Sequence, residues 1–239
     1  MNRKLLVSSL CALAATLPAL ANDGSTQAND WVGNLSASED RVNVGDTPSL
    51  TWNVSYPVSL DDLIDFEGDT LVAKTDVHVE ARIVGAGWGT ETTFYYVNGS
   101  LHNGSGWVNV FHGNQPMVSP SSVVYEDILE AGTSINAAGR GALRTGPDPS
   151  SWTSWYVSWN TTPNVIALRD GDKAPQIDPA YEIQQGVEDY LSPYVSAETG
   201  LITLGPLDVI YLFDFNDYDS RGFDLQDLAI LLTFSKKQP

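Results

Sequence analysis

Hydrophobic and polar residues alternate along much of the chain, with the period of two that is typical of β-strands. Between Leu50 and Val54 every second residue is apolar, and the residues between them are polar. The same pattern runs from Val77 to Ile83. Because one face of such a segment is apolar, each predicts a half-buried strand. Further strands are predicted over 41–44, 92–97, 107–111, 152–159, 165–168, 207–213 and 228–234, and another begins at Val123.

Turn-forming residues separate these segments. The pair Asn98-Gly99 predicts a tight hairpin turn between the strands over 92–97 and 107–111. Glycine and proline are frequent over 139–149, which predicts an exposed loop. A second loop is predicted over 61–69, and for it we favour solvation over weak calcium binding by its carboxylates, Asp61, Asp62, Asp65, Glu67 and Asp69.

One segment has helical rather than β periodicity. Apolar residues recur at i, i+4, i+7 and i+8 over 181–191, and Pro193 follows, so a short helix is predicted there. Nine or more short strands with a single helix predict an all-β fold, a β-sandwich or jelly roll. The opening of the chain, with a Gly45-Asp46 turn before a strand that carries Trp52, also resembles the start of an immunoglobulin-like sandwich.

The first 21 residues have the pattern of a secretory signal peptide. Arg3 and Lys4 precede an apolar stretch, and Ala19-Leu20-Ala21 is a small-x-small cleavage site. We therefore expect a secreted, extracellular protein, with the periplasm or the outer cell surface as alternatives. The predicted organisation is a loose tail over 22–36 and a sandwich domain over 37–239, which a boundary near 116–120 would divide in two.

Cysteine usage and charge narrow the range of partners. The only cysteine, Cys11, lies in the predicted leader, so the rest of the chain can form no disulfide or zinc-thiolate site. Thirty acidic residues against 12 Lys and Arg give a net charge of −18. Nucleic acids and anionic membrane surfaces are therefore poor partners, whereas cations and neutral glycans are suitable ones. No stretch after the leader is long and apolar enough to span a membrane.

The densest group of acidic residues lies near the C-terminus, between two apolar strands. Calcium takes six to eight oxygen ligands, and closely spaced Asp and Asn around a glycine turn supply them. The spacing differs from that of an EF-hand loop, because Tyr218 occupies the fifth position and no Glu ends the loop. A solvated, turn-rich loop is the alternative. The predicted calcium ligands are Asp214, Asn216, Asp217, Asp219, Asp224 and Asp227.

An aromatic run over 152–159 is the second candidate site. On a strand, Trp155, Val157 and Trp159 would face one way, and Trp152 and Tyr156 the other. One face would belong to the core, and the other would form a platform for sugar rings or part of a partner interface. We select as candidate ligand-binding residues Trp152, Trp155, Tyr156 and Trp159. Other aromatic residues that could join them are Trp88, Tyr95, Tyr96 and Trp107.

Catalytic motifs are lacking in the sequence. Its histidines, His78, His102 and His112, form no pair at metal-ligand spacing, and no nucleophile elbow, phosphate-binding loop or dinucleotide fingerprint is present. A polymer-degrading hydrolase with paired carboxylates is therefore the weakest of the alternatives.

Two segments resemble a family of bacterial extracellular β-sandwich domains of unknown function, found in calcium-rich adhesins. The first is the glycine-aromatic stretch Val84–Val97, and the second is the Asp-containing stretch Phe223–Phe234. The resemblance implies a sandwich that binds calcium near its closing strand, with Asp224 and Asp227 as the positions that carry over. From all of this we expect a secreted, non-enzymatic surface protein in adhesion or matrix assembly, stabilised by calcium, with a carbohydrate-binding module as the alternative.

Overall fold

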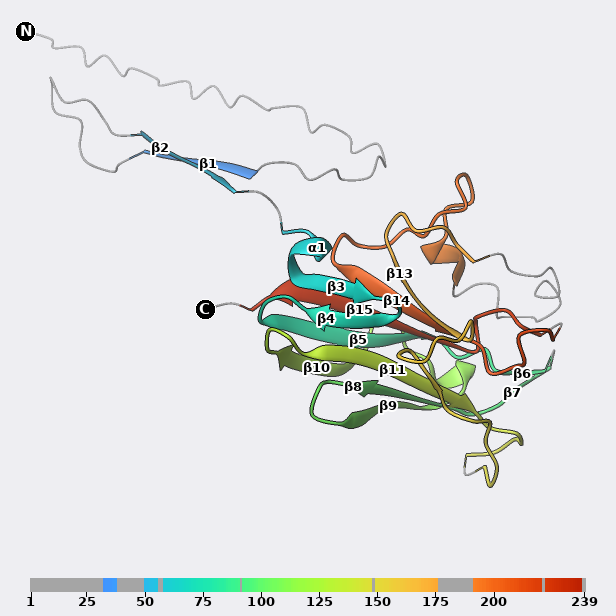
Figure 1. Ribbon diagram of the computed structural model, residues 1–239. Helices are drawn as coiled ribbons and strands as arrows, with labels where there is room; N and C mark the ends of the chain where they lie inside the picture. Colours follow the sequence, from blue (N-terminus) through green and yellow to red (C-terminus); the bar gives the residue numbers. More distant parts are fainter. Residues whose placement is uncertain are drawn as a thin grey trace, which may run out of the picture. The chain divides into compact units, whose positions relative to one another are not determined.

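The computed structural model describes residues 32–37, 50–55, 58–90, 92–147, 149–175, 191–220 and 222–237 (Figure 1). The predicted signal peptide lies outside these residues, as does the predicted helix over 181–191 except for its last residue. Contacts divide the chain into two units, residues 1–57 and 58–239. Residues 116–120, where a boundary was considered, lie within the second unit.

The first unit contains one antiparallel pair of strands. Strand β1 (Val32–Ala37) pairs with β2 (Leu50–Ser55), and Leu35 lies opposite Trp52. Strand β2 confirms the strand predicted from the alternation over 50–54. Strand β1 lies mostly in the segment for which a loose tail was predicted.

The second unit is built from two large antiparallel sheets and a two-stranded one, which β6 (Gly89–Thr90) and β7 (Thr93–Phe94) form (Figure 1). The five-stranded sheet has the order β10 (Val123–Leu129), β5 (Val77–Gly85), β15 (Leu228–Lys236), β14 (Asp208–Phe213) and β13 (Val165–Arg169). The six-stranded sheet has the order β3 (Ile64–Glu67), β4 (Thr70–Ala73), β11 (Ser134–Gly141), β8 (Val97–His102) and β9 (Trp107–Gly113), with β12 (Tyr156–Val157) paired to β11. The shorter elements are α1 (Leu60–Leu63) and the 3₁₀ turns η1 (Gln115–Met117) and η3 (Ser192–Tyr194). The all-β, sandwich-like fold predicted from the sequence is confirmed.

The main core lies between the two sheets. Alternate residues of β5 are fully buried there, as the period-two pattern predicts. Strands β14 and β15 are apolar almost throughout, because each of them is buried on both faces. Tyr211 and Phe213 contribute to the core between the sheets, whereas Ile210 and Leu212 pack in a second apolar cluster with Leu191.

The predicted Asn98-Gly99 hairpin turn is wrong, because both residues lie inside β8. Gly99 allows the two sheets to approach each other closely, because a Cβ atom at this position would lie 3.1 Å from Leu228 Cδ2. Gly139 on the neighbouring strand has the same role, since its Cβ would lie 2.9 Å from Phe215 Cε1. Both glycines are thus set by packing between sheets rather than by a turn.

Four further segments differ from their predictions. The strand expected over 92–97 is limited to Thr93 and Phe94, and β8 begins at Val97. The strand expected over 152–159 is limited to Tyr156 and Val157, because the preceding residues leave the sheet after a single bridge between Trp152 and Ala142. The loop expected over 139–149 starts only after Gly141, where β11 ends. The segment 61–69 forms α1 and β3 rather than a loop, and a capping box joins Ser59 to Asp62, whose carboxylate accepts hydrogen bonds of 2.9 and 2.8 Å from the Ser59 N–H and hydroxyl.

No helix in the described part of the chain has the length and hydrophobicity needed to cross a membrane.

Candidate functional site

The outer face of the six-stranded sheet forms the floor of an aromatic pocket. On β11, Ile135 and Ala137 point into the core between the sheets, so Ala138 points outward. The strand register places Ala138 opposite Ser100 on one side and Val157 on the other. These three short side chains line the bottom of a pocket of about 370 Å³.

Three tryptophans form the walls of this pocket. They are Trp107 from β9 and Trp155 and Trp159 from either side of β12, with exposed fractions of 42%, 41% and 50%. The ring centroids of Trp107 and Trp159 are 5.1 Å apart, and the His102 ring contacts both indoles edge-on, at 5.2 and 5.8 Å. We call Trp107, Trp155 and Trp159 with their floor the tryptophan pocket. Its size and apolar walls are typical of small-ligand sites.

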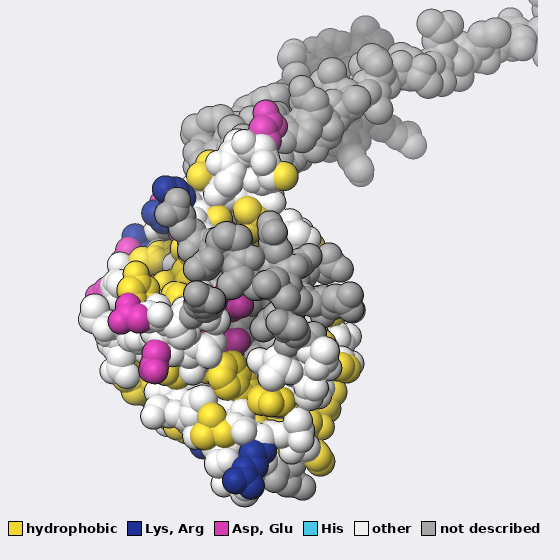
Figure 2. Space-filling view, turned by 90° about the vertical axis from the view of Figure 1, so that its right-hand side faces the viewer, with side chains coloured by type: hydrophobic (Ala, Val, Ile, Leu, Met, Phe, Trp, Pro, Cys, Tyr) yellow, Lys and Arg dark blue, Asp and Glu magenta, His cyan; other side chains and the backbone are white. Residues whose placement is uncertain are grey.

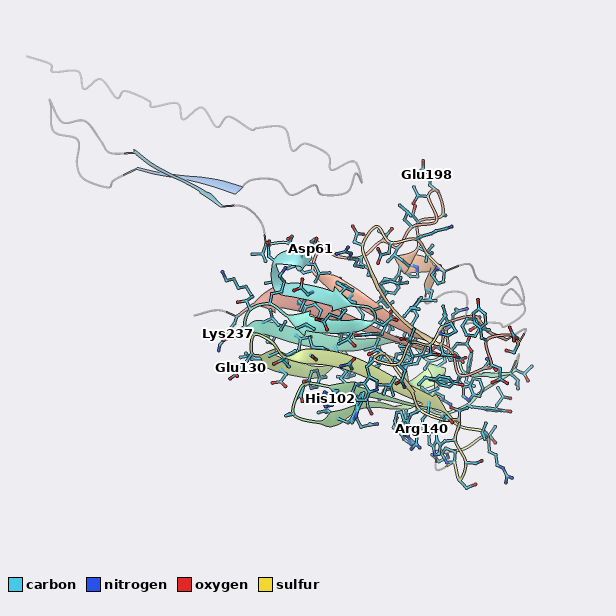
Figure 3. All side chains as sticks on the ribbon, in the orientation of Figure 1. Asp61, His102, Glu130, Arg140, Glu198 and Lys237 are labelled. Atoms are coloured by element: carbon cyan, nitrogen blue, oxygen red, sulfur yellow. The ribbon has the colours of Figure 1, made fainter. Side chains whose placement is uncertain are left out.

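An arginine extends this surface beyond the pocket. The guanidinium carbon of Arg140 lies 4.5 Å from the Trp152 ring and 4.5 Å from the Trp155 ring, so the cation is held between two indoles. Trp155 is therefore shared, because it also lines the tryptophan pocket. Figure 3 labels Arg140 and His102, which lie along the same sheet.

The four predicted ligand-binding residues have different places in the structure. Trp155 and Trp159 line the tryptophan pocket, and Trp152 covers one face of Arg140. Tyr156 instead packs on the core, where its ring stacks on Phe215 at 6.1 Å. Burial raises the pKa of Tyr156, and nearby aspartates raise it further.

Sequence reasoning did not select two residues of this surface, His102 and Arg140. Both reach it through strand pairing. His102 lies opposite Trp107 in the β8–β9 hairpin, and Arg140 lies opposite Asn98 of β8, which is distant from it in the sequence. Side chains alternate along β11, which places Arg140 on the same face as Ala138, but no strand was predicted over these residues. Of the other aromatic residues considered, Trp107 joins the pocket, whereas Trp88 packs on Phe215 in the core.

The Asp-rich segment between β14 and β15 is the second candidate site, and it has the opposite character. Asp214, Asp224 and Asp227 are buried, with exposed fractions of 0%, 9% and 5%. The Asp214 carboxylate accepts hydrogen bonds from three backbone N–H groups, those of Asp224, Asn216 at 2.7 Å and Leu225 at 2.9 Å. These bonds connect the two ends of the segment across its loop.

The other two buried carboxylates also accept backbone hydrogen bonds. Asp227 accepts one from the Phe215 N–H at 2.6 Å, and Asp224 accepts one from Gln226 at 3.1 Å. Leu225, between them, has a φ of 59°, in the left-handed region that non-glycine residues rarely adopt. Its N–H bond to Asp214 stabilises this conformation, so the carboxylates brace the loop from within.

Burial and mutual repulsion shift the ionisation of all three carboxyl groups. Burial raises the pKa of Asp214, although its three N–H partners oppose the shift. Burial and then the charge of Asp214 raise the pKa of Asp224 to about 7. The same two causes, together with the charge of Asp224, raise the pKa of Asp227 well above its ordinary value.

The six predicted calcium ligands thus separate into an inner and an outer set. The inner carboxylates are close enough to influence each other, and their oxygens are of the type that calcium prefers. Asp217 and Asp219 are exposed, and the Asn216 amide donates to the Gly222 carbonyl at 2.7 Å. Calcium binding stays a prediction for this segment. A separate group, His78, Glu80 and Glu126, places three metal-ligating side chains near one another on the five-stranded sheet, but Glu80 pairs with Arg82 and His78 with Glu126.

Comparison of the chain with protein-family models, with curated proteins and with solved structures yields no match. The resemblance to adhesin domains therefore stays a prediction, and the functional conclusion depends on the geometry of the two candidate sites.

Proposed function

We propose that this protein is a non-enzymatic, exported β-sandwich protein that binds glycan chains in the tryptophan pocket. One observation carries the proposal: three tryptophans, each more than two-fifths exposed, surround a pocket of about 370 Å³ on one sheet face. Exposed indoles are costly to leave in water without a partner, and clustered ones mark binding surfaces.

The chemistry of the pocket suits a sugar ring. A pyranose has apolar C–H faces and a polar rim, so it needs flat apolar walls and a few hydrogen-bonding groups at the edge. The indoles supply the walls. The hydroxyl of Ser100 at the floor supplies a polar group of the required kind. Such a mixture of apolar walls and few polar groups gives orientation and specificity.

The lining of the pocket also favours binding over catalysis. Among the described residues that line it there is no Asp or Glu, although the chain has 30 acidic residues. Glycoside hydrolysis commonly uses two carboxyl groups that flank the scissile bond. A binding role in adhesion or matrix assembly, outside the cell as the predicted leader indicates, fits a pocket without such a pair.

Calorimetric titration of the purified protein with a panel of soluble polysaccharides tests the proposal. We expect at least one neutral or acidic polysaccharide to bind. Trp107→Ala and Trp159→Ala should each weaken that binding at least tenfold, because each removes one wall of the pocket.

Tyr218→Ala is the matched control, since Tyr218 is 62% exposed and lies outside the pocket, next to Phe223. It should bind like the unchanged protein. No binding across the panel, or equal losses in the control and the tryptophan variants, would contradict a glycan site in the pocket.

A further inference from the structure

Arg140 lies directly beside the tryptophan pocket. It is two residues from Ala138 on the same face of β11, a separation of roughly 7 Å along the strand. Trp155 connects the two places, since it forms a wall of the pocket and covers one face of the guanidinium. A chain of sugar rings that fills the pocket and continues along the sheet in this direction would pass over Arg140.

The guanidinium of Arg140 has no carboxylate partner in the described part of the chain. Two other arginines of the second unit form ion pairs, Arg82 with Glu80 and Arg169 with Asp61. Two lysines do the same, Lys74 with Asp65 and Lys237 with Asp76. The Arg140 guanidinium contacts two indoles, and within the described residues its buried Nε atom has no hydrogen-bond partner. Arg140 thus differs from these four basic residues, because no carboxylate of the described residues neutralises its charge.

A second arginine lies in the loop that follows β11. The loop that follows β11 is the lowest part of the second unit in Figure 1, and the lower part of Figure 2 shows hydrophobic and basic side chains there. No Asp or Glu of the described residues is in view in that part of Figure 2. Arg144, four residues further along, is exposed. Arg140 and Arg144 are thus two of the 12 basic residues in a chain whose net charge is −18.

We infer that the glycan is acidic, a polyuronate-type chain whose sugar carboxylate binds Arg140 while a neighbouring ring fills the tryptophan pocket. This inference rests on the proposed function and specifies its ligand. The guanidinium carbon lies 4.5 Å from the centre of each indole ring, so the cation is fixed against aromatic surface and offers its N–H groups to a ligand. A planar carboxylate accepts two such N–H groups side by side, in the geometry that arginine favours.

Burial lowers the pKa of Arg140, but the side chain remains a cation at neutral pH. The indoles also hold the guanidinium in one orientation, so little freedom is lost when a carboxylate binds. The alternative role for Arg140 is purely structural, a clamp that fixes Trp152 and Trp155 over the sheet. The two roles differ in their dependence on the charge of the ligand.

The test compares polyuronates with their own carboxyl-reduced forms. Alginate, polygalacturonate and glucuronan are titrated before and after chemical reduction of the carboxylates to primary alcohols, which keeps every ring and linkage. We expect the protein to bind at least one intact polymer tenfold or more tightly than its reduced form. This preference should weaken as the salt concentration rises, because it depends on charge.

Arg140→Met keeps most of the apolar length of the side chain and removes the charge, so it should abolish the preference while the reduced polymer still binds. Arg144→Met, a loss of a nearby exposed arginine, should leave most of the preference. Circular dichroism and the melting temperature of each variant show whether it is folded, and Arg140→Lys, which keeps the charge, provides a second variant if Arg140→Met unfolds.

The outcomes separate the inference from the proposed function. Equal binding of intact and reduced polymers, by the unchanged protein and by Arg140→Met, would overturn the inference and leave the glycan site standing. Equal weakening of both forms by Arg140→Met would assign Arg140 to the structural clamp and also overturn the inference. No binding of either form of any polymer would overturn both.

Discussion

The tryptophan pocket and the Asp-rich segment differ in the direction in which their functional groups point. Both are dense clusters of one residue type. The indoles of Trp107, Trp155 and Trp159 lie on the outer face of a sheet and are two-fifths to one-half exposed. The carboxylates of Asp214, Asp224 and Asp227 are buried, and backbone N–H groups already occupy their oxygens. A cluster of one residue type therefore does not by itself identify a binding site. Exposed side chains are free to bind a ligand, whereas buried ones stabilise the loop.

Calcium binding would have the largest effect on this comparison, because the Asp-rich segment would then be a binding site as well. We expect 5 mM calcium to raise the melting temperature relative to excess chelator. A site with a Kd of about 1 µM would add about 5 kcal/mol to the free energy of unfolding. Asp224→Ala combined with Asp227→Ala should lose this shift, so that its melting temperature is the same with calcium and with chelator. Equal melting temperatures of the unchanged protein with calcium and with chelator would contradict calcium binding by the Asp-rich segment.

Loss of the central brace should have the next largest effect. Asp214→Ala leaves three backbone N–H groups without their acceptor, and we expect it to lower the free energy of unfolding by about 3–4 kcal/mol in urea titrations. Asp219→Ala, in the same segment but exposed, should change it by less than about 0.5 kcal/mol. Similar small effects of both substitutions would show that the buried carboxylate does not brace the loop.

The raised pKa values predict that stability falls as the pH rises. In the unfolded chain the carboxyl groups of Asp224 and Asp227 lose their protons near pH 4, whereas in the folded chain the pKa of Asp224 is about 7 and that of Asp227 is well above its ordinary value. Between these limits the folded state holds more protons. The free energy of unfolding should therefore fall by about 1.4 kcal/mol per pH unit for each such carboxyl group.

Urea midpoints measured in chelator at pH 5, 6 and 7 check this slope. Asp224→Asn removes one of the titrating groups and should flatten the slope, whereas Asp219→Asn should leave it unchanged. A midpoint that rises from pH 5 to pH 7, or an equal slope in Asp224→Asn, would contradict the assignment.

The strands that the sequence predicted best are those whose burial follows a local pattern. The alternation from Val77 to Ile83 and the apolar run over 228–234 both correspond to strands. The prediction of an Asn98-Gly99 turn was wrong because Gly99 is required by its close contact with Leu228. Leu228 belongs to the other sheet, so no local sequence pattern reveals this contact. The strand predicted over the aromatic run 152–159 was also wrong for most of its length. Trp152 and Trp155 lie outside the strand and pack on the Arg140 guanidinium.

The sequence predicted the aromatic character of the candidate site but not all of the residues that form it. Trp155 and Trp159 could be selected because they lie close together in the sequence. Arg140 and His102 could not, because only the register of β11, β8 and β9 brings them to the same face. For the Asp-rich segment, the sequence indicated the cluster, whereas the burial of Asp214, Asp224 and Asp227 depends on the packing of β14 and β15 in the two-sheet core.

Intrinsic tryptophan fluorescence tests the central claim most directly, because the proposed ligand would contact the indoles that emit. The unchanged protein and a Trp107→Ala, Trp159→Ala double variant are titrated with the same polysaccharide panel. The account predicts a saturable fluorescence change in the unchanged protein with at least one polysaccharide, and its loss in a double variant that remains folded. A flat response of the unchanged protein to every polysaccharide, or the same saturable response in both proteins, would contradict a glycan site in the tryptophan pocket.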